Sequence, residues 1–259
     1  MGILPGEKLQ RRLTVGVTAL LIVGICMVFA LSKQDVGTPP PNPAAQTETP
    51  APQGSLSGLT IVIDPGHGGY DGGAKCRDSG VWEKELNLAV ALETEKALVR
   101  RGANVVMTRR RDEDLCTEDR PEGKTMKRQD MERRIGIAAA ANADMVLSIH
   151  MNEYRDRRES GPQVFYRPGA DSGRLLAGCM QEALIQGVNP AKERTAMSGD
   201  YFILQLGMPS VLIECGFISN SAEEARLLTA DYREQLAEAI GQGVEQYVTM
   251  SRRLNGETQ

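Results

Sequence analysis

Residues 61–74 read IVIDPGHGGYDGGA, an apolar run that passes directly into a glycine-rich turn. The run begins with β-branched residues typical of a buried strand, and Pro65 and the glycines that follow end it. His67 stands inside the turn. Ligands in open α/β sheets gather at the carboxyl ends of the strands. The stretch therefore predicts one strand of such a sheet and places a candidate functional imidazole at its edge.

Apolar runs and longer amphipathic stretches alternate over the rest of the chain. Strands are predicted at residues 59–64, 104–108, 145–150, 163–166 and 210–214. Helices are predicted at residues 84–101, 126–142, 172–187, 222–229 and 232–248. Apolar side chains recur at helical spacing in the first helix, and Gly102 supplies a stop signal after it. Strands that alternate with helices indicate a single α/β domain.

The amino-terminal region carries the signal of a membrane anchor. Residues 13–32 contain no charged side chain and are rich in Leu, Val and Ile, and Lys8, Arg11 and Arg12 precede them. A helix of this length matches the bilayer core, and the cations favour a cytoplasmic position for residues 1–12. A cleaved signal peptide is the alternative, but its apolar region is usually shorter. We therefore expect a single-pass anchor in the cell membrane, with the catalytic domain outside the cytoplasm.

The segments after the anchor differ in composition. Residues 33–57 are dominated by Pro, Thr, Ala and Gln, which predicts a semi-extended, Pro-rich linker. Residues 58–250 are expected to form the catalytic domain, and residues 251–259 a short carboxyl-terminal tail. The formal net charge is -4, with Lys and Arg scattered among Asp and Glu, so no basic face is expected. Nucleic acid is therefore excluded as a predicted partner.

The cysteines do not form a dense disulfide framework. Cys26 lies in the apolar run, and Cys76, Cys116, Cys179 and Cys215 are widely separated without a C-x-x-C pair. A bridge between Cys76 and Cys116 is compatible with an oxidising compartment. Four small buried or reduced thiols are the simpler interpretation.

Four side chains that suit metal-assisted hydrolysis stand at or near the ends of predicted elements. The chain has only two histidines, and His150 ends the strand in MVLSIHMN as His67 follows the first strand. Glu83 opens a helix in WEKELNL, and Glu214 ends the apolar run PSVLIE. A lone histidine at a strand end can simply complete a local hydrogen bond. Two histidines and one carboxylate, however, form a standard hydrolytic zinc site, and a second carboxylate can serve as general base.

Several blocks, in this order along the chain, resemble the N-acetylmuramoyl-L-alanine amidases of the zinc-dependent type 3 family. They are DPGHGGYDGGA, WEKELNLAVAL, VVMTR, SIHMN and PSVLIECGFISN. The resemblance runs from about residue 59 to residue 248. It implies a single phosphorylase/hydrolase-like α/β domain with a mixed central sheet and helices on both faces. It also implies peptidoglycan glycan strands and stem peptides as substrate, cut at the amide between the lactyl group of N-acetylmuramic acid and L-alanine.

The resemblance further implies that Zn²⁺ is held by His67, Glu83 and His150, with Glu214 as the catalytic carboxylate. The chemistry of the residues agrees, since zinc lowers the pKa of water towards about 7 and polarises a carbonyl. Glu214 would take the proton of that water and deliver it to the departing nitrogen. Glu85 is the nearest rival ligand, but two residues along a helix place it about 200° away from Glu83.

Other residues have two interpretations each. Asp64 is predicted either to accept a hydrogen bond from a ligand imidazole or to cap the turn, and Asn152 either to contact substrate or to stabilise its loop. Arg194 departs from an Asn-Arg-Gly run of the family, which puts a substrate role for it in doubt. The charge-rich residues 109–120 are expected to form a solvated loop. Tight turning of the backbone around the metal is assigned to Gly66, Gly68, Gly69, Gly72 and Gly73.

Within the family, the chain is most similar to the membrane-anchored sporulation amidases of endospore-forming bacteria. This subgroup implies a role in formation of muramic-δ-lactam in the spore cortex and a position in the forespore intermembrane space. Two alternatives have the same residues: a zinc peptidase acting within the stem peptide, and an inactive wall-binding or activator module. Whether an accessory protein assists the enzyme is left open by the sequence.

Overall fold

The computed structural model describes residues 54–117 and 122–256. The predicted cytoplasmic segment 1–12, the anchor 13–32 and nearly all of the linker 33–57 lie outside these ranges. Within the described residues, no helix combines the length and the apolar character needed to cross a membrane.

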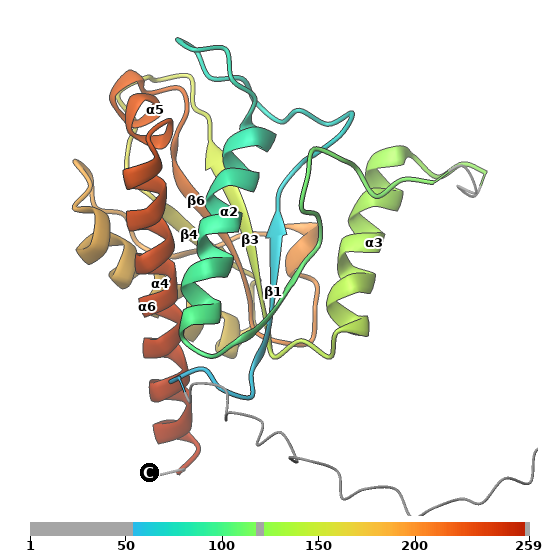
Figure 1. The fold of residues 1–259 in the computed structure, drawn as a ribbon, viewed down its shortest axis with the longest axis vertical. Coiled ribbons are helices and arrows are strands. Elements are labelled where there is room, and N and C mark those ends of the chain that lie inside the picture. Colours follow the sequence, from blue (N-terminus) through green and yellow to red (C-terminus); the bar gives the residue numbers. More distant parts are fainter. Residues whose placement is uncertain (1–53, 118–121, 257–259) are drawn as a thin grey trace, which may run out of the picture. The chain divides into compact units, whose positions relative to one another are not determined.

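A mixed sheet forms the centre of the described domain (Figure 1). Its strands are β1 (Thr60–Pro65), β2 (Asn104–Met107), β3 (Met145–Asn152), β4 (Gln163–Tyr166), β5 (Met197–Ser198) and β6 (Ser210–Phe217). The order across the sheet is β2-β1-β3-β6-β4-β5. Strands β2, β1, β3 and β6 are parallel, whereas β4 runs antiparallel to β6. The carboxyl ends of β1, β3 and β6 therefore meet at one edge of the sheet.

Helices cover both faces of the sheet (Figure 1). They are α2 (Glu83–Arg100), α3 (Met126–Ala140), α4 (Asp171–Val188), α5 (Ser221–Leu227), α6 (Ala230–Leu254) and the 3₁₀ turn η1 (Phe202–Leu204). Helix α6 packs against both α2 and α4 on one face, and α3 lies with η1 on the other. The expected α/β domain with a mixed sheet between two helical layers is confirmed.

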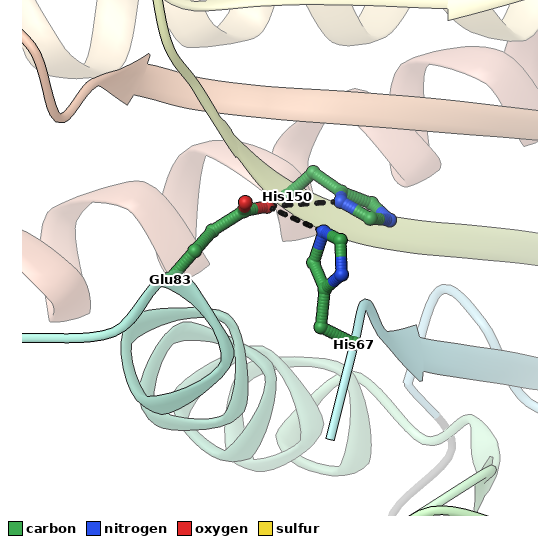
Figure 2. Close-up of side chains that lie close together, drawn as sticks. All are labelled: His67, Glu83 and His150. Carbon is green, nitrogen blue, oxygen red and sulfur yellow. Dashed lines mark hydrogen bonds and ion pairs between the residues drawn. The ribbon is translucent and has the colours of Figure 1, made fainter. Parts of the chain in front are cut away.

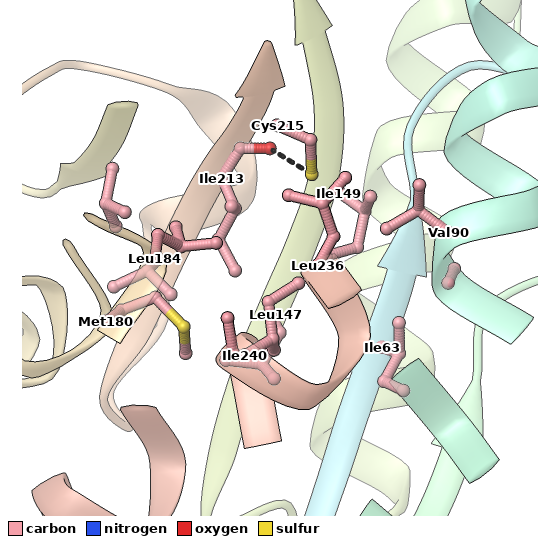
Figure 3. Packing of buried hydrophobic residues seen from close by; sticks show 14 of the residues in the cluster. Ile63, Val90, Leu147, Ile149, Met180, Leu184, Ile213, Cys215, Leu236 and Ile240 are labelled. Carbon is pink, nitrogen blue, oxygen red and sulfur yellow. Dashed lines mark hydrogen bonds between the residues drawn. The ribbon is translucent and has the colours of Figure 1, made fainter. Parts of the chain in front are cut away.

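Alternating side chains of the central strands divide the core between the two faces. Ile63 and Leu147 belong to the larger cluster, where they meet α2 and α6, while Val62 and Val146 join a smaller cluster with Ala138 of α3. Figure 3 shows the larger cluster, with Ile240 of α6 beside the strands. Because β1 and β3 are buried on both faces, they read as continuous apolar runs in the sequence.

The structure differs from the predicted boundaries in a few places. Strand β5 and turn η1 were not predicted, since both are too short to carry a periodic signal. Leu56, inside the predicted linker, is fully buried, and its N–H donates to the main-chain oxygen of Arg101 at 3.0 Å. Helix α6 continues past residue 250 to Leu254. The folded domain thus extends beyond residues 58–250 at both ends.

The cysteines of the described residues follow the simpler interpretation. Cys76, Cys179 and Cys215 are buried thiols, and Cys76 and Cys116 are not joined by a disulfide. Each buried thiol acts as a small apolar side chain within the larger core cluster.

Candidate metal centre

The turn after β1 presents His67 in a conformation that few residues adopt. Its φ of 60° is left-handed, which costs a residue with a Cβ about 1–2 kcal/mol. The preceding Gly66 lies against the ring of His150, because a Cβ at Gly66 would approach Cε1 and Nε2 of that ring to 2.2 Å. Gly73 similarly leaves room for Glu83, whose Oε2 would be 2.5 Å from an added Cβ. Close approach of the backbone to these side chains explains Gly66 and Gly73, whereas Gly68, Gly69 and Gly72 lie against Glu113, Asp114 and Trp82.

Glu83 joins the two histidines (Figure 2). It is the first residue of α2 and is 4% exposed. Its Oε1 lies 3.2 Å from Nε2 of His67 and 3.1 Å from Nδ1 of His150. The imidazoles themselves are 5.0 Å apart between ring centres and nearly perpendicular. One ligand atom from each of the three residues lies within 4.8 Å of the others, a spacing that suits a shared metal ion.

Hydrogen bonds from two backbone N–H groups and one side-chain amide hold the Glu83 carboxylate in place. Oε2 accepts from the N–H of Ala74 at 3.0 Å, and Oε1 accepts from Nδ2 of Asn87 and from the N–H of Met151. Burial by itself would raise the pKa of Glu83, but the contacts with His150 and His67 outweigh it and hold the pKa far below its ordinary value. Glu83 is therefore ionised at neutral pH.

The second nitrogen of His67 faces another carboxylate. Nδ1 lies 2.9 Å from Oδ2 of Asp71, an ion-pair distance without hydrogen-bond geometry. Burial would lower the pKa of His67, yet Glu83 and then Asp71 raise it above its ordinary value. A carboxylate behind a ligand imidazole is the usual device that fixes the orientation of the ring. The sequence reasoning did not assign this role to Asp71.

Glu214 lies on the strand next to His150. The two residues are paired in the register of β3 and β6. Its Oε2 is buried and has no hydrogen-bond partner among the described residues. Burial raises the pKa of Glu214 to about 7; His150 opposes the shift and the charge of Glu83 adds to it. An unpaired buried carboxyl oxygen is costly, so this group is suited to exchange a proton with a bound molecule.

A cavity of about 210 Å³ opens beside both imidazoles. Its walls come from the His67 turn, from α3 through Lys127 and Met131, and from Tyr201 and Phe202 at η1. Burial raises the pKa of the Tyr201 hydroxyl, and the charge of Glu214 adds to the shift. The cavity places open space next to both imidazoles.

Glu85 and Asp64 lie near the site but form hydrogen bonds that support the fold. Oε1 of Glu85 accepts the N–H of Trp82 at 3.4 Å and so caps the start of α2. Asp64 is buried and accepts hydrogen bonds from Thr108, Ser148 and Arg134. Both predicted roles of Asp64 are wrong, because its donors are two hydroxyls and a buried guanidinium, and neither an imidazole nor its own turn is among them.

Arg109 corrects the prediction for residues 109–120. It is 2% exposed, although many of its charged neighbours in the loop are exposed as expected. Arg109 lies two residues after the end of β2, as His67 lies two residues after the end of β1, and that position was a signal for a buried role. Arg134 of α3 was also missed, since it stands in a run of charged residues.

Arg194 and Asn152 support loops. Nε of Arg194 donates to the main-chain oxygen of Ser160 at 2.7 Å, and its guanidinium lies over the ring of Phe217. The main-chain oxygen of Asn152 accepts the N–H of Ile218 at 2.9 Å, where the β3–β6 register shifts. These contacts account for Arg194 without a substrate.

Comparisons with known proteins agree with the geometry. The family model described as N-acetylmuramoyl-L-alanine amidase matches residues 61–246. The germination-specific N-acetylmuramoyl-L-alanine amidase of Bacillus subtilis is 33% identical over 75% of this chain and 81% of its own length. The CwlD amidase of Clostridioides difficile, solved in complex with the GerS lipoprotein, is 34% identical with a TM-score of 0.70, covering 74% of this chain and 99% of that one. The amidase AmiC2 of Nostoc punctiforme is 31% identical with a TM-score of 0.64, over 74% and 99% of the two chains.

The raised pKa of Glu214 predicts a pH dependence of stability in the metal-free protein. Unfolded chains release this proton near pH 4.5, whereas the folded state holds it to about pH 7. The stabilisation by protonated Glu214 is therefore complete below pH 4.5 and is lost as the pH rises through 7. Denaturant unfolding of the chelator-treated chain should show the parent losing stability relative to Glu214→Gln over this interval. A difference that stays constant with pH would contradict the assignment.

Proposed function

The chain belongs to the N-acetylmuramoyl-L-alanine amidase family, and we propose that it is a zinc enzyme that hydrolyses the amide between the lactyl group of N-acetylmuramic acid and L-alanine in peptidoglycan. The observation that carries the proposal is the convergence of His67, Glu83 and His150, with Glu214 one strand away. These residues come from four separate parts of the chain. Their meeting at one edge of the sheet, with both imidazoles beside a cavity, is what hydrolysis of an unreactive amide requires.

The three converging side chains fit a zinc ion. Two imidazole nitrogens and one carboxylate oxygen are the donors of many catalytic zinc sites, and three protein ligands leave one position open. Glu83 supplies a buried negative charge, and Asp71 stands behind His67. Bound there, zinc would lower the pKa of water and polarise the scissile carbonyl.

Glu214 is the proposed general base and acid. Its unpaired Oε2 can accept a proton from the attacking water and then donate it to the alanine nitrogen as that nitrogen leaves. A carboxyl group with a pKa near 7 is efficient in both directions at neutral pH, because neither form is strongly preferred. Burial of Oε2 keeps this oxygen away from bulk water, which would otherwise compete for the proton.

The finer proposal concerns the biological setting. Similarity to the germination-specific amidase of B. subtilis and to C. difficile CwlD supports a role in formation of muramic-δ-lactam in the spore cortex. Residues 13–32 would hold the catalytic domain at the outer face of the cell membrane, in the forespore intermembrane space. The GerS lipoprotein bound to CwlD supports an accessory protein for this chain. If this chain is isolated from sporulating cells without any associated protein, the proposal of an accessory protein is contradicted.

Substitutions separate the proposed zinc ligands from the proposed base. His67→Ala, His150→Ala and Glu83→Gln should lose bound zinc, because each removes one of three ligands. Glu214→Gln should keep zinc and lose about 10²–10⁴-fold in peptidoglycan hydrolysis, since it removes proton transfer alone. Metal analysis and hydrolysis assays of the purified full-length chain measure both effects. Glu85→Gln is the matched control and should change neither, whereas zinc loss there would refute the ligand assignment.

The products distinguish the amidase from a peptidase acting within the stem peptide. Mass spectrometry of digested peptidoglycan should show intact stem peptides that begin with L-alanine, together with glycan whose lactyl groups are bare. Alanine retained on the sugar would instead identify a peptidase. Binding to peptidoglycan without any product, in the zinc-loaded chain with its accessory protein, would identify an inactive wall-binding module.

Deletion of the gene tests the sporulation role. Cortex muropeptides from the deletion strain should lack muramic-δ-lactam, because the amide must be removed before the lactam ring can close. The parent gene should restore the lactam, and the Glu214→Gln gene should not. Normal lactam content in the deletion strain would exclude this role while leaving the enzymatic proposal intact.

A further inference from the structure

Arg109 is a buried cation whose hydrogen bonds go to main-chain carbonyls. Nε donates to the oxygen of Pro65 at 3.0 Å, and one terminal nitrogen donates to the oxygens of Gly66 and Lys84, both at 2.9 Å. The other terminal nitrogen donates to the oxygen of Arg111 at 3.1 Å. Among the described residues, no carboxylate forms an ion pair with Arg109 within 4.0 Å. Its bonds therefore hold backbone, not a charged partner.

This arrangement is costly, which calls for a compensating role. A guanidinium that is 2% exposed has lost most of its hydration, and buried charges are normally paired with an opposite charge. Burial and the neighbouring Arg134 lower the pKa of Arg109 to about 10, although the charges of Asp64, Asp112 and Asp130 oppose the shift. The side chain still carries its charge at neutral pH. The sheet edge thus contains a permanent cation directed at three carbonyl oxygens close to the metal site.

The carbonyls that Arg109 contacts adjoin two metal ligands. Gly66 immediately precedes His67, and Lys84 immediately follows Glu83. One terminal nitrogen of Arg109 therefore links the turn that carries one ligand to the helix that carries the other. The two ligand atoms at this junction, Nε2 of His67 and Oε1 of Glu83, are 3.2 Å apart.

A second buried arginine donates to the same turn. Arg134 donates to the main-chain oxygens of Pro65 at 2.8 Å and His67 at 2.7 Å. Unlike Arg109, it is also paired with Asp64 and Asp130. Its removal would leave two carboxylates without their partner, so Arg109 is the cleaner residue to test.

We propose that Arg109 is a positioning residue that fixes the separation of His67 and Glu83 and thereby sets the zinc affinity of the site. The inference rests on the proposed zinc chemistry. Without the clamp, the left-handed His67 turn and the start of α2 can move apart, and the three ligands no longer stand ready at one point. A lysine cannot replace the arginine, because a single ammonium on a flexible stem lacks the planar fork that reaches several carbonyls in fixed directions.

The test compares zinc affinity in Arg109→Met and Arg109→Lys with that of the parent full-length chain. Competition with a chromophoric chelator, well below the melting temperature, should give a zinc Kd raised about 10–100-fold in Arg109→Met, the range for loss of a group that orients ligands. Arg109→Lys should show a smaller loss in the same direction. The visible spectrum of the cobalt-substituted protein should change in both, since it reports ligand geometry.

Arg101→Met is the matched control. Arg101 stands at the opposite end of α2 and contacts Glu238, Glu245 and the main-chain oxygen of Ala97, so its loss weakens tertiary structure far from the site. It should lower the melting temperature and leave the zinc Kd and the cobalt spectrum unchanged. Equal weakening of zinc binding by Arg101→Met at equal loss of stability would overturn the inference.

The remaining outcomes separate this inference from the proposed function. If the parent chain and Arg109→Met bind zinc equally tightly, the inference about Arg109 is overturned, while the proposed zinc function stands. A parent chain that binds no zinc overturns both. If Arg109→Met does not fold, the folded Arg109→Lys variant decides: weaker zinc binding supports the clamp, and parental binding refutes it.

Discussion

The shared contact of the Glu83 carboxylate with two imidazoles is the interaction on which the site depends. A carboxylate that is 4% exposed is stable only where other groups replace its lost hydration. The lost hydration of Glu83 is replaced by contacts with His67 and His150, the side chain of Asn87, and the N–H groups of Ala74 and Met151. These contacts keep Glu83 ionised and fix its position. The same contacts make the region attractive to a divalent cation, because two ring nitrogens and a full negative charge already face one another.

The sheet topology explains why these groups meet. Strands β1, β3 and β6 are adjacent and parallel, so their carboxyl ends share one edge. The turn after β1 brings His67 to that edge, β3 brings His150, and β6 brings Glu214. Helix α2 begins beside them and contributes Glu83 from its first residue. The parallel pairing of neighbouring strands, together with the β1–α2 connection that folds back over their ends, thus brings residues far apart in the chain into a single cluster.

Beneath the site, buried charge supports backbone geometry. Arg109 and Arg134 both donate to the carbonyls of residues 65–67, and Asp64 balances Arg134. A left-handed turn at His67 would relax if it were held only by its own sequence, since that conformation is unfavourable for a residue with a Cβ. Cations directed at its carbonyls oppose that relaxation. The rigidity of the site therefore comes from polar groups, while the apolar clusters on either face of the sheet stabilise the strands that carry it.

The sequence by itself determined the alternation of strands and helices, the α/β class and the four side chains placed at the sheet edge, because apolar periodicity and element ends are local properties. It did not reveal β5 or η1, which are too short for any period to develop. The roles of Asp64, Asp71 and Arg109 were decided only by the tertiary structure. Asp64 depends on Arg134, and Arg109 on the carbonyls of two separate elements. Asp71 faces His67 within the same turn, in a backbone conformation that only the fold reveals. From sequence alone, a charged residue is predicted to be exposed to solvent. Which carbonyls lie within hydrogen-bonding distance of it depends on the fold, and no local sequence pattern indicates them.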